Sequence, residues 1–191
     1  MRTPILAFAI ATCLACGKPA AEQDPAKSEP SFTPSGKTRE ETADGLVMVV
    51  PEEWQRAPGR SSMRKAELVL SGPGGEARLV VYRFAGGAGT AAQNIDRWSS
   101  QIEPKPGGEP KTSELEANGL RITSLEAAGR FAGQSMPGMP AQPPIDDARL
   151  LAAAIEGSGD PYYLKLVGPA ATIDPWVPAW NEMLSKLAVA K

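Results

Sequence analysis

Glycine-rich turns, each lying between two apolar segments, constrain the fold of this chain more than any other feature of its sequence. Residues 67–70 and 78–84 flank such a turn at 71–75. Asn118-Gly119 separates two further segments that suit strands, and this dipeptide favours the type I′ turn of a β-hairpin. Because a tight turn brings the chain back antiparallel to itself, these patterns predict a sheet made of hairpins.

A helix is predicted from about Thr90, where the chain leaves the second of these strands. Its apolar residues recur at helical spacing, namely at Ile95, Trp98 and Ile102. Pro104 ends the segment. This spacing turns Ile95 and Trp98 toward a core and is expected to turn Asn94 and Arg97 toward solvent.

A second helix is predicted near the C-terminus. Asp174 suits its N-cap, because Pro175 follows at the first helical position. One apolar face is formed by Val177, Trp180, Leu184 and Leu187. Trp98, Trp176 and Trp180 are expected to lie in the core and to anchor the two helices.

The fold class follows from the order of these elements. Further strands are expected at 45–51, 150–156 and 162–167, the last two joined by the turn at 157–161. The sequence therefore predicts an α+β protein, with an antiparallel β-sheet of about six to seven strands flanked by two main helices.

The first residues resemble a secretory signal. Arg2 precedes an apolar stretch from Ile5 to Ala15, which is too short to span a bilayer, since that takes about 20 apolar residues. The segment Cys13-Leu14-Ala15-Cys16-Gly17 resembles a bacterial lipobox. This resemblance implies that residues 1–15 are a lipoprotein signal peptide and that Cys16 becomes the lipidated first residue of the mature chain.

Two alternatives remain open at these cysteines. Cys13 stands where the lipobox usually has leucine, and it could itself carry the lipid, with Thr12 at the cleavage site. A disulfide between Cys13 and Cys16 is the other possibility. No cysteine follows residue 16, so the rest of the chain has neither a disulfide nor a catalytic thiol.

Residues 16–42 differ in composition from the remainder of the chain. They consist mainly of Pro, Ala, Ser, Lys and Glu, with Phe32 as their single aromatic residue. Such a segment buries too little apolar surface to offset its chain entropy. We expect residues 16–42 to be a disordered tether and residues 43–191 to form one globular domain.

The charge balance bears on the class of partner. The chain has 20 basic and 22 acidic residues and a formal net charge of −2. Nucleic-acid binding proteins carry a clustered basic face, which this balance does not suggest, so no nucleic-acid partner is expected.

Several segments resemble a group of small bacterial lipoproteins of uncharacterised function, whose strand order is similar to the PsbP-like α/β/α sandwich. The matching stretches are GLVMVVPEEW, MRKAELVLSGPG, EARLVVYRF, AAQNIDRW and YYLKLVGPAATI. The resemblance covers about residues 43–190. It implies a PsbP-like domain that binds a partner through its surface, while fold alone cannot supply an activity.

Glycine-containing motifs that resemble nucleotide-binding sites lack neighbouring features that such sites need. Residues 72–77 match the letters of the dinucleotide fingerprint, but a strand comes after them where that site needs a helix. Residues 35–38 read Ser-Gly-Lys-Thr, without the first glycine of a P-loop. The glycines at 86–89 precede the helix expected from Thr90 and could bind an anion; we interpret them as a turn with Thr90 as N-cap.

Candidate catalytic groups are few. The chain has no histidine, which removes Ser-His-Asp triads and most zinc sites. Adjacent carboxylates occur at Glu52/Glu53 and at Asp146/Asp147, and both pairs are more typical of charged surface than of acid–base catalysis. A histidine-free hydrolase is therefore only the third hypothesis.

A metal-binding function is the second hypothesis. Met136 and Met139 lie in a proline-rich loop, and thioether sulfur favours Cu(I). Two thioethers do not complete a site, but Met48 or Met63 could join them. The first hypothesis remains a non-enzymatic, cofactor-free lipoprotein. It is exported, anchored to the cell envelope by its lipid, monomeric, and binds a protein partner.

The lipid anchor can be tested by metabolic labelling. Cys16→Ser is expected to abolish palmitate incorporation and to leave an uncleaved or soluble precursor, because the acylated thiol is gone. Cys13→Ser is the matched control and should keep its label. Labelling that survives Cys16→Ser and is lost in Cys13→Ser would move the anchor to Cys13.

Overall fold

The larger of two sheets holds eight strands, all paired antiparallel. In the computed structural model, which describes residues 32–58, 62–86, 88–133, 142–157 and 159–190, this sheet has the order β3-β4-β5-β10-β9-β8-β6, and β7 also pairs with β8. The strands are β3 (Gln55–Arg56), β4 (Arg64–Gly72), β5 (Gly75–Arg83), β6 (Ile102–Pro104), β7 (Lys111–Ala117), β8 (Leu120–Phe131), β9 (Ile145–Glu156) and β10 (Tyr162–Pro169).

A smaller sheet packs beside the C-terminal helix. It has the order β1-β2-β11, with β1 at Thr38–Ala43, β2 at Leu46–Pro51 and β11 at Ala188–Val189. The first and last strands of the described chain thus flank β2. This sheet contributes Leu46, Met48 and Val50 to the core.

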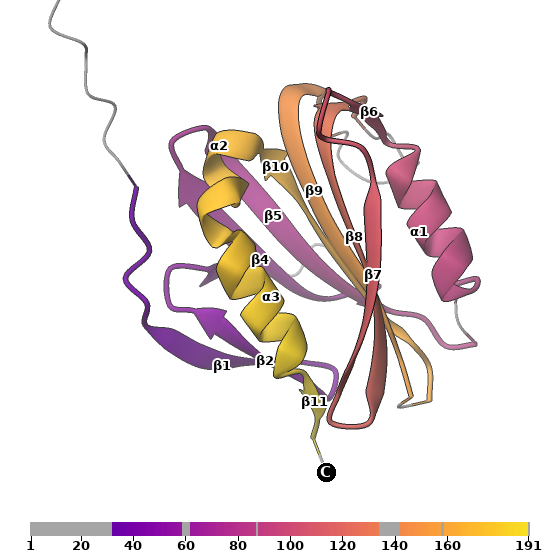
Figure 1. Cartoon of the computed structure of the whole chain (residues 1–191). Helices are drawn as coiled ribbons and strands as arrows, with labels where there is room; N and C mark the ends of the chain where they lie inside the picture. The colour runs from indigo at the N-terminus through magenta and orange to yellow at the C-terminus, as the bar shows by residue number, and fades with distance from the viewer. Residues whose placement is uncertain (1–31, 59–61, 87, 134–141, 158, 191) are drawn as a thin grey trace, which may run out of the picture. The chain divides into compact units, whose positions relative to one another are not determined.

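Helices lie on both sides of the main sheet, which gives three layers (Figure 1). On one side, α1 (Ala91–Ser99) contacts β8 and β9. On the other side, α2 (Ala170–Ile173) leads through a 3-10 turn at Asp174–Trp176 into α3 (Val177–Ser185), which contacts β2. The predicted α+β class, an antiparallel sheet flanked by two main helices, is confirmed.

The predicted hairpins are confirmed as well. Asn118 and Gly119 have φ values of 50° and 78°, the positive angles that a type I′ turn requires, and they join β7 to β8. The strand count exceeds the six to seven expected because β1 was not predicted and because β3, β6 and β11 contain only two or three residues each. Strands as short as these last three leave no periodic pattern in a sequence.

Two apolar clusters fill the spaces on either side of the main sheet. The cluster on the α3 side contains Trp54, Trp176 and Trp180, and the cluster on the α1 side contains Trp98 and Phe131. The expectation that Trp98, Trp176 and Trp180 are core residues is confirmed, since all three are buried.

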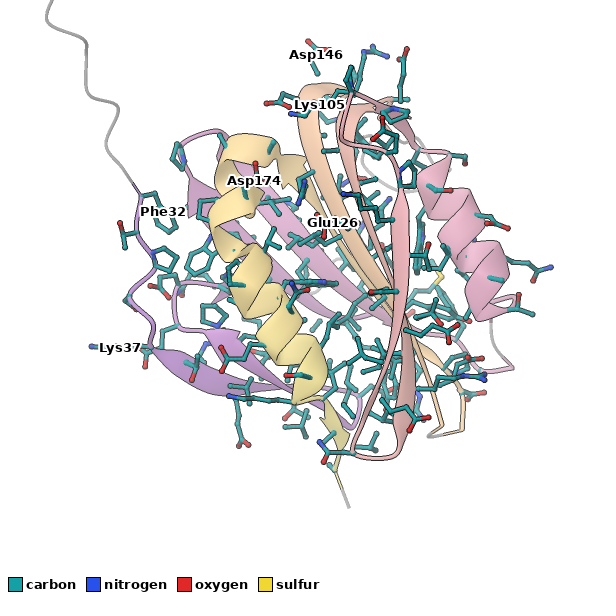
Figure 2. The ribbon with its side chains drawn as sticks, viewed as in Figure 1. Phe32, Lys37, Lys105, Glu126, Asp146 and Asp174 are labelled. Atoms are coloured by element: carbon teal, nitrogen blue, oxygen red, sulfur yellow. The ribbon has the colours of Figure 1, made fainter. Side chains whose placement is uncertain are left out.

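The start of the C-terminal helix differs from the prediction. Asp174 is not the N-cap, because the chain is already helical at Ala170 and the side chain of Asp174 makes no capping hydrogen bond. Its carboxylate lies 3.5 Å from Nε of Arg149, which also pairs with Glu126. Asp174 and Glu126 are both labelled in Figure 2. The aspartate thus links the C-terminal helical segment to the sheet instead of capping it.

The globular unit begins before the boundary expected at residue 43. It spans Phe32–Lys191, so all of β1 except its last residue, Ala43, falls inside the segment predicted to be a tether. The ring of Phe32 lies 5.2 Å from that of Trp176, and Ser35 N donates a hydrogen bond of 2.8 Å to Glu53. These contacts bind residues 32–37 to the domain.

Paired charges explain why composition misplaced this boundary. β1 reads Thr-Arg-Glu-Glu-Thr-Ala, which looks like solvated chain. In the structure Glu41 is buried and accepts hydrogen bonds from Arg39 and Arg56, while Arg39 also donates to the carbonyl oxygen of Trp54. Burial of a charge is tolerated when it is paired in this way.

The contribution of residues 32–37 to stability can be measured with two substitutions in the same segment. Phe32→Ala is expected to lower the free energy of unfolding by about 1–3 kcal/mol, since it removes a half-buried ring from an aromatic contact. Lys37→Ala, at an exposed side chain directed away from the domain in Figure 2, should leave the free energy nearly unchanged. Denaturant titrations measure both free energies of unfolding. If Phe32→Ala and Lys37→Ala both leave the free energy nearly unchanged, the domain begins at residue 43, as the sequence predicted.

Candidate functional site

Buried charges lie on the α1 side of the main sheet, across β4, β5 and β10. The strand register pairs Glu67 with Val80 and Val80 with Lys165, so these residues form one row on one face. Glu67 is 1% exposed and Lys165 is 7% exposed. Both charged groups therefore lie in surroundings that would normally hold apolar side chains.

The carboxylate of Glu67 is held by two guanidinium groups. Nη1 of Arg64 lies 2.6 Å from one carboxylate oxygen, and Nη1 of Arg78 lies 2.8 Å from the other. Arg78 also contacts the exposed Glu76, at 2.9 Å. A buried carboxylate needs partners of this kind, because removing its hydration is costly.

Lys165 brings a positive charge into the middle of the sheet. Its Nζ donates a hydrogen bond of 2.5 Å to Oε1 of Gln101 and lies 5.2 Å from the ring centroid of Phe131. Burial lowers the pKa of Lys165 from 10.5 to about 8, and the positive charge of Arg97 acts in the same direction. The amine is therefore protonated at neutral pH and loses its proton more readily than an exposed lysine.

Three polar residues line one side of α1 and the turn after it: Asn94, Arg97 and Gln101, spaced i, i+3 and i+7. Asn94 donates to the carbonyl oxygens of Ala88 and Thr90, both at 3.0 Å, and accepts from Arg97 at 2.5 Å. The expectation that Asn94 faces solvent is wrong, because these carbonyls bind its amide in the interior. Arg97 is exposed as expected.

The start of α1 matches the interpretation as a capped turn. Thr90 accepts a hydrogen bond from the backbone of Gln93, whose side chain accepts one from the backbone of Thr90. The hydroxyl of Tyr163 donates to the carbonyl oxygen of Gly89 at 2.9 Å. The capping box satisfies N–H groups that an anion would need, so the helix start is not our candidate site.

Tyr82 adds a hydroxyl to this face. Its ring stacks on Phe84 at 5.9 Å, and Phe84 in turn lies 6.2 Å from the ring of Tyr163. Burial raises the pKa of the Tyr82 phenol, although Arg64 and Arg97 lower it. The phenol therefore keeps its proton at neutral pH and remains a hydrogen-bond donor.

We call the four cations Arg64, Arg78, Arg97 and Lys165 the basic face. They come from β4, β5, α1 and β10, so the whole fold on this side is needed to bring them together. Fixed positive groups beside a neutral hydroxyl donor can bind an anionic group. This is the chemistry that the arrangement offers.

None of the residues of the basic face stood out as a candidate in the sequence. The available signal was a single charge inside an apolar strand, Lys165 in Tyr-Tyr-Leu-Lys-Leu-Val and Glu67 in Ala-Glu-Leu-Val-Leu. Such a charge either faces solvent or finds partners in the fold. The choice depends on neighbours that are distant in the sequence.

The sites named from the sequence fall in different places. Cys13, Cys16, Met136 and Met139 lie outside the described residues. Within the described part of the chain, Met48 is buried in the core while Met63 is exposed, so these two do not share surroundings that would suit one metal ion. No group of three or more potential His, Cys, Asp or Glu ligands occurs among those residues either.

The adjacent carboxylates form ordinary surface contacts. Asp146 lies 3.2 Å from Arg130, and Asp147 lies 2.6 Å from Lys105, at the edge of the sheet labelled in Figure 2. At the other pair, hydrogen bonds from Ser35 lower the pKa of Glu53. These surroundings fit the interpretation as charged surface.

The burial of Lys165 predicts a defined pH dependence of stability. Below pH 8 both the folded and the unfolded chain hold the proton, so the full cost of the buried charge remains. Between pH 8 and 10.5 the folded chain has released a proton that the unfolded chain still binds, so the free energy of unfolding rises with pH.

Lys165→Met removes this titration. The free energy of unfolding of the natural chain should rise relative to that of Lys165→Met by up to about 3 kcal/mol between pH 8 and 10.5. Denaturant titrations of both proteins at several pH values measure the difference, with Lys186→Met, at an exposed position at the end of α3, as the control for losing one lysine. A difference that is constant over this range would contradict the burial of a charged Lys165.

No helix in the described part of the chain is long and apolar enough to cross a membrane.

No known family model matches the sequence, and no curated protein matches it. Solved structures do show similarity. Cyanobacterial PsbP (CyanoP) from Synechocystis sp. PCC 6803 is 14% identical with a TM-score of 0.48, over 80% of this chain and 91% of that one.

Two further structures are similar. LpqN of Mycobacterium tuberculosis, described as involved in cell envelope biogenesis, is 13% identical with a TM-score of 0.47, over 81% of this chain and 91% of that one. PA94 of Pseudomonas aeruginosa, a protein of unknown function, is 18% identical with a TM-score of 0.40, over 82% of this chain and 99% of that one. At these distances the likeness transfers neither a partner nor an activity.

Proposed function

We propose that this chain is a non-enzymatic lipoprotein of the bacterial cell envelope, whose globular domain binds an acidic surface of a protein partner through the basic face. The observation that carries the proposal is the exposed guanidinium of Arg97, which Asn94 positions on the side of the sheet where Arg64, Arg78 and Lys165 add positive charge. Complementary charge favours encounter with an acidic partner and helps to select it.

The charge on this face is only partly compensated among the described residues. Arg64 and Arg78 share the single carboxylate of Glu67, and Arg78 also reaches Glu76. Arg97 forms no ion pair with any described carboxylate, and its guanidinium is positioned by Asn94. An exposed cation that is held in place by a buried amide is suited to recognition, because little side-chain freedom is lost on binding.

The envelope location rests on the first residues of the sequence. Lipidation at Cys16 would hold the domain at a membrane through the segment that precedes Phe32. The partner would then be a protein that the domain can reach from that anchor. The copper hypothesis gains no support from the described residues, since the two thioethers that motivated it lie outside them.

Charge reversal on the basic face tests the proposal. Full-length protein with Cys16 intact is crosslinked in cells, and covalent products are resolved by mass spectrometry. Arg97→Glu is expected to remove at least one major heteromeric product, because it places a negative charge against an acidic surface. Lys37→Glu, an equal change of charge at an exposed residue of the first segment, should keep that product.

Folding and specificity are controlled in the same experiment. Arg97 is exposed, so its replacement should leave the circular dichroism spectrum and the unfolding midpoint nearly unchanged. A set of crosslinked products that is identical for the natural chain, Arg97→Glu and Lys37→Glu would exclude the basic face as the binding surface.

A further inference from the structure

Two buried tryptophans lie side by side on the α3 side of the main sheet. Trp54 follows β2 and Trp176 ends the 3-10 turn before α3, and their ring centroids are 6.0 Å apart with an angle of 83° between the rings. Both belong to the apolar cluster on this side of the sheet. Together with Glu53, which precedes Trp54, we call these residues the tryptophan site.

The first segment of the described chain occupies this site. The ring of Phe32, labelled in Figure 2, meets that of Trp176 edge to face, with 5.2 Å between the centroids. Three residues later, Ser35 N donates a hydrogen bond of 2.8 Å to Oε1 of Glu53. The site thus binds an aromatic ring and a main-chain N–H group that stand three positions apart.

These two contacts do not require the sequence of this segment. Thr33 and Ser35 are exposed, and the N–H group that Ser35 donates is present in every residue except proline. The ring of Phe32 is half-buried and makes an edge contact that other aromatic side chains also make. A peptide from another protein can therefore form both contacts if it carries an aromatic residue at the right position.

Polar groups of the tryptophan site have no partners among the described residues. The indole N–H groups of Trp54 and Trp176 are buried and donate to none of these residues, and the buried Oε2 of Glu53 accepts from none of them. A buried indole N–H usually has a partner, because leaving it unpaired costs free energy. An occupant that brings carbonyl oxygens to the two indoles would therefore bind more tightly than residues 32–35.

The native segment has the advantage of belonging to the same chain. Its contacts are one half-buried ring and one hydrogen bond, but its effective concentration at the site is on the order of millimolar. A peptide from a partner must displace residues 32–35 before it can bind. The segment therefore keeps the site closed to weak competitors.

We propose that the tryptophan site binds an extended peptide segment of a protein partner, whose aromatic ring replaces that of Phe32 and whose main-chain N–H three positions later replaces that of Ser35. Residues 32–35 act as an intramolecular competitor for the site. This inference goes beyond the proposed function and does not depend on it, because the basic face lies on the α1 side of the main sheet. Binding involves no covalent step.

The probe is a synthetic peptide with blocked ends and this chain's own residues 31–36, Ser-Phe-Thr-Pro-Ser-Gly, added to the full-length protein. Phe32→Ala removes the competing ring, so this variant should bind the peptide saturably and about tenfold or more tightly than the natural chain does. Tryptophan fluorescence follows the binding. The unfolding midpoint of Phe32→Ala should also rise with peptide concentration, because a ligand of the folded state stabilises it.

A second variant opens the site by another route. Ser35→Pro removes the N–H group that is donated to Glu53, and it too should bind the peptide more tightly than the natural chain. This variant keeps the ring of Phe32, so the test does not depend on the folding of Phe32→Ala alone. Thr33→Ala, at an exposed residue of the same segment, is the matched control and should bind the peptide as the natural chain does.

Peptides with a changed second residue test the need for an aromatic ring. Tyrosine or tryptophan in place of phenylalanine should preserve binding to Phe32→Ala, while alanine should weaken it by about tenfold. The proposal is overturned if neither Phe32→Ala nor Ser35→Pro binds the original peptide saturably, or if the alanine peptide binds as tightly as the original. Equally tight binding of the original peptide by the natural chain and by both variants would also overturn it, since residues 32–35 would then not compete for the site.

Discussion

The pairing of β10 with both β5 and β9 holds the main sheet together. β5 belongs to the N-terminal half of the chain and β9 to the C-terminal half, so the ladders on the two edges of β10 unite strands that are far apart in sequence. Every residue from Tyr162 to Gly168 is buried, which leaves β10 with no solvent-facing side. A charged side chain in this strand must therefore find its partners inside the protein, and Lys165 does so beneath α1.

β10 is packed on both of its faces and also carries the buried charge of Lys165. The apolar side chains of β10 that point away from α1, such as Leu164 and Leu166, lie in the cluster that contains Trp176 and Trp180. Those that point toward α1 alternate with them, and Lys165 sits between Tyr163 and Val167. The amine is thus carried by a strand that is braced on both faces, which keeps the basic face in one conformation and limits the ordering cost of binding.

Local patterns in the sequence were sufficient for the hairpins and for most of α1. Asn118-Gly119 dictates its turn through backbone preferences that operate within four residues, and Thr90 caps a helix through contacts equally close in sequence. The pairing of β10 with β5 involves no local signal. Likewise, β1 resembled solvated chain because of its charged residues. Its buried glutamate, Glu41, is neutralised by Arg56, a residue on another strand that the local sequence does not reveal. The candidate site could not be predicted for the same reason, since the burial of Lys165 depends on α1 and that of Glu67 on two arginines.

The contacts of Phe32 and Ser35 give the protein a mechanical property. If the chain is held at a membrane, any pull arriving along the backbone first loads the Phe32–Trp176 contact and the Ser35–Glu53 hydrogen bond, before it reaches the ladder between β1 and β2. These two contacts are weak, so they would break before the stronger ladder between β1 and β2. The sheet that carries the basic face lies beyond both, so tension on the anchor would be dissipated at the edge of the domain while the binding surface keeps its shape.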